Sequence, residues 1–301
     1  MSTSTILAPE AWQAPTYGRY RRTVRFFRRM PVTGLVGGAI LLVFTLGAIF
    51  APLVAPYDPN TGNTLNRLIA PGVDHWFGTD QLGRDLFSRV LYGGRYSLGA
   101  SLAVVSLSAT VATVVAVISG YFGGKVDLVI QRFVDAWIAF PVFILLIALI
   151  SLLGPNLRNV IVVMSIAMAG GMSRILRSNV MVIKEAPYVE MARVIGANDV
   201  RIMAFHVFPQ VVPLILVLAS VQLGGVVLAL ASLGFLGFGI PPPTPEWGSM
   251  LSGRTRDFMY SAWWLGLFPG LAITLAVLSL NLFFDSVRDV IDPRMRGTGR
   301  H

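Results

Sequence analysis

Long runs of uncharged residues alternate with polar segments along this chain, and several runs are long enough to cross a bilayer as a helix. The windows that predict spans are residues 32–56, 96–124, 136–157, 159–173 and 258–284. The fourth window is short, but its helix can continue past Arg174 and Arg177, because their long side chains can reach the membrane surface.

Residues 202–245 form the longest window without a charged residue. This window accommodates one span followed by a re-entrant piece, or two short spans that break at Gly224-Gly225, and the sequence leaves both arrangements open. With one span counted here, the chain is predicted to be an all-α polytopic membrane protein with six transmembrane helices.

The polar segments divide unequally between the two sides of the membrane, with most of the 24 basic residues on one side. Because cytoplasmic loops are enriched in lysine and arginine, both termini are predicted to be cytoplasmic. The expected organisation is a basic arm over residues 1–31, a first span over 32–56, an extracytoplasmic segment over 57–95, a five-helix core over 96–286 and a tail over 287–301. The first apolar run begins too late for a cleavable signal, so the arm is expected to remain near anionic lipid.

Composition agrees with this pattern. The chain is 54% hydrophobic and 13% charged, which leaves too little polar surface to cover a soluble globule of 301 residues. It contains no cysteine, so disulfides and thiolate metal sites are excluded. The net charge of +9 comes from arginines that flank apolar runs, and a nucleic-acid partner is therefore not expected.

The polar segment 184–209 within the core predicts two short helices at the cytoplasmic surface. Gly196 ends the first helix with a residue suited to a left-handed conformation, and Asn198 or Asp199 can cap the second, which runs toward Pro209. An apolar face is expected from residues at helical spacing, namely Tyr188, Met191, Ala192 and Ile195. From spacing alone, an ordinary interfacial amphipathic helix explains the segment equally well.

The order of residues in this segment is similar to a known pattern. Glu190-Met191-Ala192, three residues, Gly196, nine residues and then His206-Val207-Phe208-Pro209 resembles the EAA loop of ABC importer permeases. Met191 replaces an alanine of that pattern, His206 an isoleucine and Phe208 a leucine. The resemblance implies that this loop is a coupling helix that docks on a separate ATPase subunit. The residues it implies for ATPase coupling are Tyr188, Glu190, Met191, Ala192, Arg193, Gly196 and Pro209.

If this loop docks on an ATPase as the resemblance implies, each residue can be assigned an expected role. Glu190 would make a polar contact at the ATPase, Tyr188 and Met191 would supply apolar docking, Ala192 would allow close approach, and Gly196 would provide the bend.

The extracytoplasmic segment supplies a second resemblance. Physically, Thr79 or Asp80 can cap a surface helix with an apolar stripe at Leu82, Leu86 and Val90. The order of residues in this segment resembles that of the segment after the first span in permeases of the dipeptide, oligopeptide and nickel branch of ABC importers. The matching residues are His75, Trp76, Gly78, Thr79, Asp80, Gly83, Arg84 and Asp85.

This second resemblance implies an ABC type I importer permease fold, and the second of two permeases, which has the short exterior segment. The implied setting is the cell membrane of a prokaryote. The implied partners are a second permease, two ATPase subunits, an extracytoplasmic binding protein and the lipid bilayer, with a peptide as the expected cargo. Dipeptide, longer peptide and nickel are not distinguished by the sequence. Similar stretches occur at 120–124, 234–243 and 245–248.

Several activities are not expected of this chain. Neither Lys125 nor Lys184, the two lysines, lies in a phosphate-binding loop, so ATP and magnesium are expected on partner subunits and no cofactor on this chain. The histidines are scattered, and no catalytic or metal site is predicted. The centres of the spans carry no charge, so an ion-driven carrier is not favoured. The alternative to an ABC importer permease is a self-contained channel or facilitator.

Polar residues inside the spans are candidates for the pathway. Ser220, Gln222 and Asn281 can line a passage, or can form hydrogen bonds between helices, which is the commoner use of such side chains. Glu246 and Trp247 suit an exterior cap as well as a substrate gate.

Overall fold

A computed structural model describes residues 30–253 and 255–291 of the chain. The described part is helical, and its one bridge between extended residues joins Thr79 and Asp85. The elements are α2 (Val32–Ile49), α3 (Ala51–Val54), η1 (Thr64–Asn66), α4 (Leu86–Phe122), α5 (Gly124–Ile138), α6 (Val142–Leu153), α7 (Leu157–Ile183), α8 (Pro187–Val194), α9 (Asp199–Ile202), the π-helix η2 (Met203–Val207), α10 (Phe208–Phe235), α11 (Trp247–Met250), α12 (Thr255–Phe258) and α13 (Trp264–Ile291).

Five of the described helices are long and apolar enough to cross a membrane, and one bent pair adds a sixth if it counts as a single span. The five are α2, α4, α7, the continuous run Asp199–Phe235 and α13. The prediction of an all-α polytopic membrane protein is confirmed. The third predicted span, residues 136–157, is not one straight helix. There the chain bends by 89° between α5 and α6. Pro141 precedes α6 and has no N–H with which to continue α5, so the helix breaks there.

The window 202–245 contains one span. Helix α10 passes Gly224-Gly225 without a break, so the arrangement with two short spans is wrong. Pro209 lies in the first turn of α10, where a missing N–H costs little, and Pro213 lies inside the helix. Beyond Phe235 the chain forms a loop that leads to α11.

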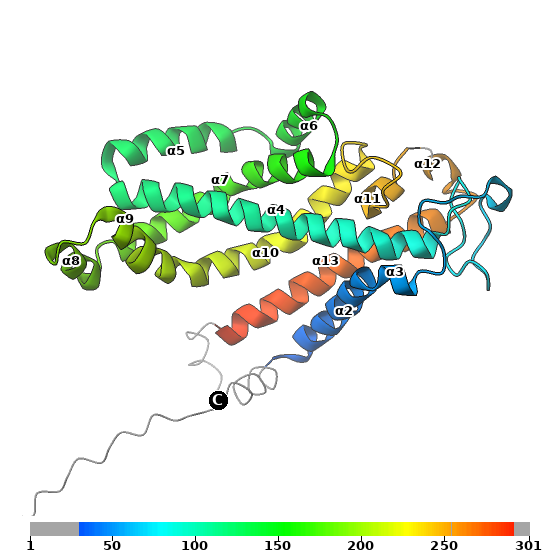
Figure 1. The fold of residues 1–301 in the computed structure, drawn as a ribbon, viewed down its shortest axis with the longest axis horizontal. Helices are drawn as coiled ribbons and strands as arrows, with labels where there is room; N and C mark the ends of the chain where they lie inside the picture. Colours follow the sequence, from blue (N-terminus) through cyan, green and yellow to red (C-terminus); the bar gives the residue numbers. More distant parts are fainter. Residues whose placement is uncertain (1–29, 254, 292–301) are drawn as a thin grey trace, which may run out of the picture.

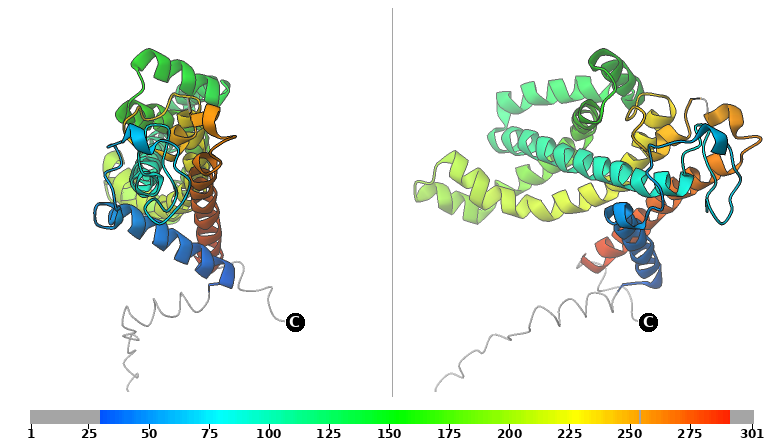
Figure 2. Two further views of the ribbon diagram at one scale, coloured as in Figure 1. Left: turned by 90° about the vertical axis from the view of Figure 1, so that its right-hand side faces the viewer. Right: turned by 45° about the vertical axis from the view of Figure 1, so that its right-hand side comes forward.

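Helix α4 runs through the middle of the bundle. It contacts α7, α10, α2 and α5, and Figure 2 shows the α2–α13 pair on one side of it and α5–α6 on the other. Small residues allow close approach within the α2–α13 pair: a Cβ at Gly34 would lie 2.3 Å from Cβ of Ser286. Figure 1 shows that the segment between α7 and α10 lies at one end of the long helices, and that residues 57–85 lie at the other end.

The start of α4 differs from the prediction. Asp85 caps the helix, because its side chain accepts a hydrogen bond from the Ser88 N–H at 2.8 Å, so the expected caps Thr79 and Asp80 are wrong. Residues before Asp85 form a turn with positive φ at Gly78 and Gly83, and the helix then continues directly into the second span. Of the expected apolar stripe, Leu86 and Val90 are buried in the first turns of α4, whereas Leu82 lies before the helix and is exposed, so the expected separate surface helix is wrong.

Candidate functional site

The segment between α7 and α10 forms the bent pair of short helices that its sequence predicts. Pro187 occupies the first turn of α8, and Gly196 follows the helix with φ of +84°. The side chain of Asn198 caps α9 by accepting a hydrogen bond from the Arg201 N–H at 2.8 Å. These three local features follow from residue type, since proline, glycine and asparagine each suit the backbone at their positions.

The apolar face of α8 is turned relative to the prediction. Val189 and Ala192 face the bundle and are buried, whereas Tyr188, Met191 and Ile195 are exposed. Of the expected face, only Ala192 packs inward. The exposed fraction reaches 62% for Met191 and 79% for Ile195, so this end of the molecule presents a group of apolar side chains outward. Such a group marks a surface that another protein can cover.

Charged residues border this apolar group. Glu190 lies in the first turn of α8 and Arg193 in its last turn, where each charge complements the helix dipole, and both are exposed. Pro209 begins α10 and is also exposed. The structure thus gathers the predicted coupling residues on α8 and its bend, with Pro209 on the next long helix.

Helix α4 meets this segment through a residue that carried no predicted role. The hydroxyl of Tyr121 donates a hydrogen bond to Oδ1 of Asp199 at 2.7 Å, and the Arg193 guanidinium lies over the Tyr121 ring at 5.5 Å. The sequence of residues Gly120–Gly124 resembles that of permeases, but this resemblance assigns no role to Tyr121.

Helices α5 and α7 share two ion pairs. Arg177 pairs with Asp127, and Arg174 pairs with Asp135. Ser119 at the end of α4 also donates to Asp127, at 2.6 Å. Each arginine therefore has a carboxylate partner on the neighbouring helix, which the sequence analysis did not predict, and the expectation that both side chains can reach the membrane surface stays a prediction.

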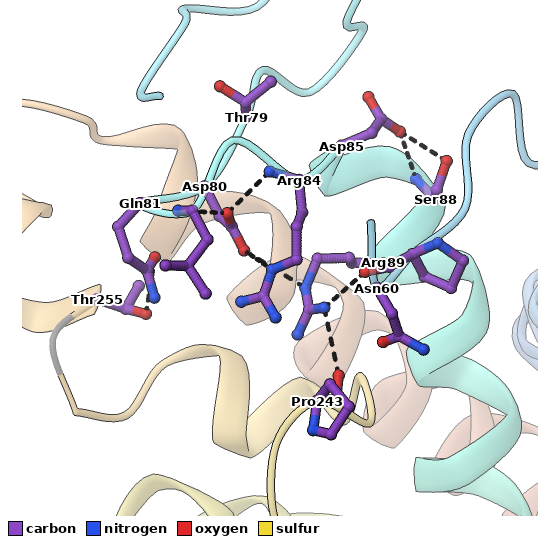
Figure 3. A network of polar contacts seen from close by, with 12 residues as sticks. Asn60, Thr79, Asp80, Gln81, Arg84, Asp85, Ser88, Arg89, Pro243 and Thr255 are labelled. Atoms are coloured by element: carbon purple, nitrogen blue, oxygen red, sulfur yellow. Dashed lines mark hydrogen bonds and ion pairs between the residues drawn. The ribbon is translucent and has the colours of Figure 1, made fainter. Parts of the chain in front are cut away.

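The segment at the opposite end of the bundle folds around Asp80 (Figure 3). The carboxylate of Asp80 accepts hydrogen bonds from the N–H groups of Leu82 and Arg84 at 2.8 and 3.0 Å, and from Nε of Arg84 at 2.7 Å. Arg89 of α4 lies 3.7 Å from the same carboxylate and donates to the carbonyl oxygen of Pro59 at 2.7 Å. These charged side chains are buried, so the network joins the segment to α4 without exposing a charge to solvent.

The other motif residues serve the same turn. His75 lies 2.9 Å from Asp85 through Nδ1, and Thr79 accepts a hydrogen bond from the Ile69 N–H at 2.8 Å. Gly78 and Gly83 supply the positive φ angles, and Trp76 is exposed. The motif that resembles peptide permeases is therefore chiefly a folding element, with Trp76 available at the surface.

Glu246 and Trp247 form a buried cap. The Glu246 carboxylate accepts hydrogen bonds from the N–H groups of Gly248 and Ser249, both at 2.7 Å, and Trp247 donates from Nε1 to the Val90 carbonyl oxygen at 2.9 Å. Burial raises the pKa of the Glu246 carboxyl, and the two backbone hydrogen bonds oppose that rise. Between the two sequence interpretations, this geometry favours the cap over the gate.

The candidate pathway residues each have a different local environment. Ser220 donates to the Leu216 carbonyl oxygen of its own helix at 2.5 Å. Asn281 on α13 faces Gly224 of α10, where a Cβ would lie 2.4 Å from its Oδ1. Gln222 is partly buried, and its Oε1 has no hydrogen-bond partner within the described residues. Their role in a pathway stays a prediction.

Two family profiles match the sequence of this chain. A profile of the family described as "Binding-protein-dependent transport system inner membrane component" matches residues 112–297. A profile described as "N-terminal TM domain of oligopeptide transport permease C" matches residues 19–71.

Several curated relatives are similar over most of their length. A putative peptide transport system permease protein of Brucella suis biovar 1 (strain 1330) is 38% identical over 298 residues, which cover 99% of this chain and 98% of the relative. The dipeptide transport system permease protein DppC of Alkalihalophilus pseudofirmus is 40% identical over 262 residues, covering 87% of this chain and 86% of the relative. A glutathione transport system permease protein of Escherichia coli O6:K15:H31 is 38% identical over 293 residues, covering 97% and 95%.

Proposed function

Because this chain belongs to the family of binding-protein-dependent transport system inner membrane components, we propose that it forms, together with a second permease, the path by which peptides cross the membrane. The chain is a permease subunit of an ABC importer. In our proposal, an extracytoplasmic binding protein delivers the peptide, and two ATPase subunits drive transport. ATP and magnesium bind to those ATPase subunits, and this chain contributes no catalytic residue.

The observation that carries the coupling role is the outward apolar surface of α8. Val189 and Ala192 fix α8 to the bundle, while Tyr188 and Met191 project away from it. Apolar side chains that meet a partner release water and stabilise the contact, so these two residues are proposed to dock on an ATPase subunit. Glu190 would add a polar contact, and Gly196 would preserve the bend between α8 and α9.

The proposed orientation places α8 in the cytoplasm together with both termini, in the inner membrane of a prokaryote. The distribution of basic residues supports this orientation. Residues 57–85 would then face the exterior, at the opposite end of the long helices (Figure 1). A cytoplasmic ATPase and an extracytoplasmic binding protein would thus each meet a different end of the chain.

A peptide is the proposed cargo because relatives of nearly full length are named for peptide, dipeptide and glutathione transport. The motif at residues 75–85 supports the same branch of permeases. Side chains of that motif fold the segment, and His75 and Asp85 also line a pocket within it. The choice among peptides is assigned to the binding protein.

Replacing Gly196 by leucine tests the coupling role. A leucine at φ of +84° is strained by about 1–2 kcal/mol and should change the angle between α8 and α9. Gly237 is a matched control, since it has φ of +87°, open space around its Cα and the same pair of helix-closing hydrogen bonds as Gly196, but follows α10. We expect Gly196→Leu to abolish ATP-dependent peptide uptake by the reconstituted transporter, and Gly237→Leu to retain it. Equal uptake by both variants would contradict the coupling role.

Purification from gently solubilised membranes separates this proposal from the channel alternative. A permease subunit should bring ATPase subunits with it, whereas a self-contained channel should come alone and conduct without ATP.

A further inference from the structure

Tyr121 connects helix α4 to both short helices of the coupling segment. This residue is 6% exposed and lies in the apolar cluster that also contains Val189 and Ala192 of α8. Its hydroxyl donates to Asp199, the first residue of α9, and its ring lies under Arg193 in the last turn of α8. One side chain of α4 thus contacts both helices, on either side of the bend.

The glycine at the bend is not itself packed against other residues. A Cβ at Gly196 would meet no atom within 4 Å, so nothing is packed against this glycine. The N–H groups of Gly196 and Ala197 donate to the carbonyl oxygens of Arg193 and Ala192, both at 3.0 Å. These bonds close the end of α8 and do not reach α9. Apolar packing also joins the two helices, since Val189 and Ala192 of α8 and Ile202 of α9 lie in one cluster. Tyr121 lies in the same cluster and adds a polar contact that both helices share.

The end of α4 is itself fixed in the bundle. Gly120 lies against α7, where a Cβ would be 2.9 Å from Cβ of Val180. The Gly123 N–H donates to the Ser119 carbonyl oxygen at 3.0 Å and ends the helix. Because the backbone on both sides of Tyr121 is held in this way, a displacement of α8 and α9 is passed to α4 instead of being absorbed by a loose end.

We propose that Tyr121 is a positioning residue for transport. Its hydrogen bond to Asp199 and its ring contact with Arg193 hold α8 and α9 as one rigid unit and transmit the movement of that unit to α4. This inference rests on the proposed function, in which α8 docks on an ATPase subunit. The bond is well suited to the task, since a hydrogen bond to a carboxylate is stronger than one between neutral groups.

The test uses the complete reconstituted transporter with both permeases, the ATPase subunits and the binding protein. It compares Tyr121→Phe, Asp199→Ala, the two combined, and Asp199→Asn. Tyr92→Phe is the matched control, because Tyr92 lies on the same helix and also has an arginine, Arg95, at 6.0 Å from its ring, but near the other end of α4. The readout is uptake per ATP hydrolysed, since a merely destabilised chain reduces the amount of complex and lowers both rates together.

We expect Tyr121→Phe and Asp199→Ala each to lower uptake per ATP roughly tenfold, the factor that corresponds to loss of one hydrogen bond to a charged acceptor. The combined variant should fall no further, because both changes remove the same bond. Asp199→Asn keeps an acceptor oxygen but loses the charge, so its loss should be smaller than that of Asp199→Ala, and Tyr92→Phe should stay close to the unmodified transporter.

Two results would overturn the proposal: unchanged uptake per ATP in Tyr121→Phe, or losses that multiply in the combined variant. Recovery of ATPase subunits with each purified chain keeps this test separate from the proposed function. An unmodified chain that purifies without ATPase contradicts the proposed function itself. Full recovery with unchanged uptake per ATP contradicts only the role of Tyr121.

Discussion

Replacing Asp80 by alanine should loosen the 57–85 segment from the bundle. Asp80 is 4% exposed and receives three hydrogen bonds, and the buried side chains of Arg84 and Arg89 both lie against its carboxylate. Removing the carboxylate leaves two buried guanidinium groups without the anion that both contact. Breaking a buried ion pair in this way costs about 3–5 kcal/mol. Asp80→Asn keeps an oxygen for the backbone donors and should cost less, about 1.5–3 kcal/mol.

Thermal unfolding of the detergent-solubilised chain, followed by tryptophan fluorescence, measures this effect. For a chain of this size each kcal/mol corresponds to about 2–4 °C, so Asp80→Ala should lower Tm by roughly 6–20 °C. Asp74→Ala is the control, since Asp74 lies in the same segment with an exposed side chain and should change stability by no more than about 0.5 kcal/mol. If both variants unfold at the same temperature, the network does not hold the segment, and our interpretation of the motif as a folding element is wrong.

Two further predictions concern the buried cap around Glu246. Burial raises the pKa of Glu246 in the folded state. The protonated side chain therefore contributes its full stabilisation at pH values below the pKa of the unfolded chain, and this contribution is lost as pH rises through the pKa of the folded chain. Glu246→Gln should therefore gain stability relative to the unmodified chain as pH rises above about 4.5, measured as Tm against pH, and a difference independent of pH would contradict this. Gly234→Ala should destabilise the chain by about 1–3 kcal/mol in thermal unfolding, since its Cβ would lie 2.3 Å from Oε2 of Glu246. Gly225→Ala on the same helix has open space and should stabilise it by roughly 0.5–1 kcal/mol, so equal effects at the two glycines would refute the close packing.

Local signals in the sequence predicted the coupling segment well. Gly196 and Asn198 act through their own backbone preferences, so their conformations follow from residue type. The buried face of α8 did not follow, because Met191 and Ile195 are as apolar as Val189. Only the packing of the whole chain decides which of them faces the bundle and which faces outward.

Features that depend on distant residues were harder to predict. Asp80 and Asp85 are both plausible helix caps by spacing, and the turn made by the 57–85 segment decides in favour of Asp85. Pro141 was a visible break signal inside the third apolar window, yet hydropathy alone favoured a straight span. The contact between Tyr121 and Asp199 joins residues 78 positions apart, and no local pattern indicates it.

The central claim is that α8 is the cytoplasmic contact for an ATPase subunit, and a single cysteine at Met191 tests it most directly. The chain has no cysteine of its own, so Met191→Cys provides a unique thiol on the exposed face of α8. Val73→Cys, at a position 93% exposed at the opposite end, is the matched control. We predict that a membrane-impermeant maleimide labels Met191→Cys only from the cytoplasmic side and Val73→Cys only from outside. We also predict that a thiol-specific crosslinker joins only Met191→Cys to an ATPase subunit. Labelling of Met191→Cys from outside, or no crosslink in an actively transporting complex, would contradict the account.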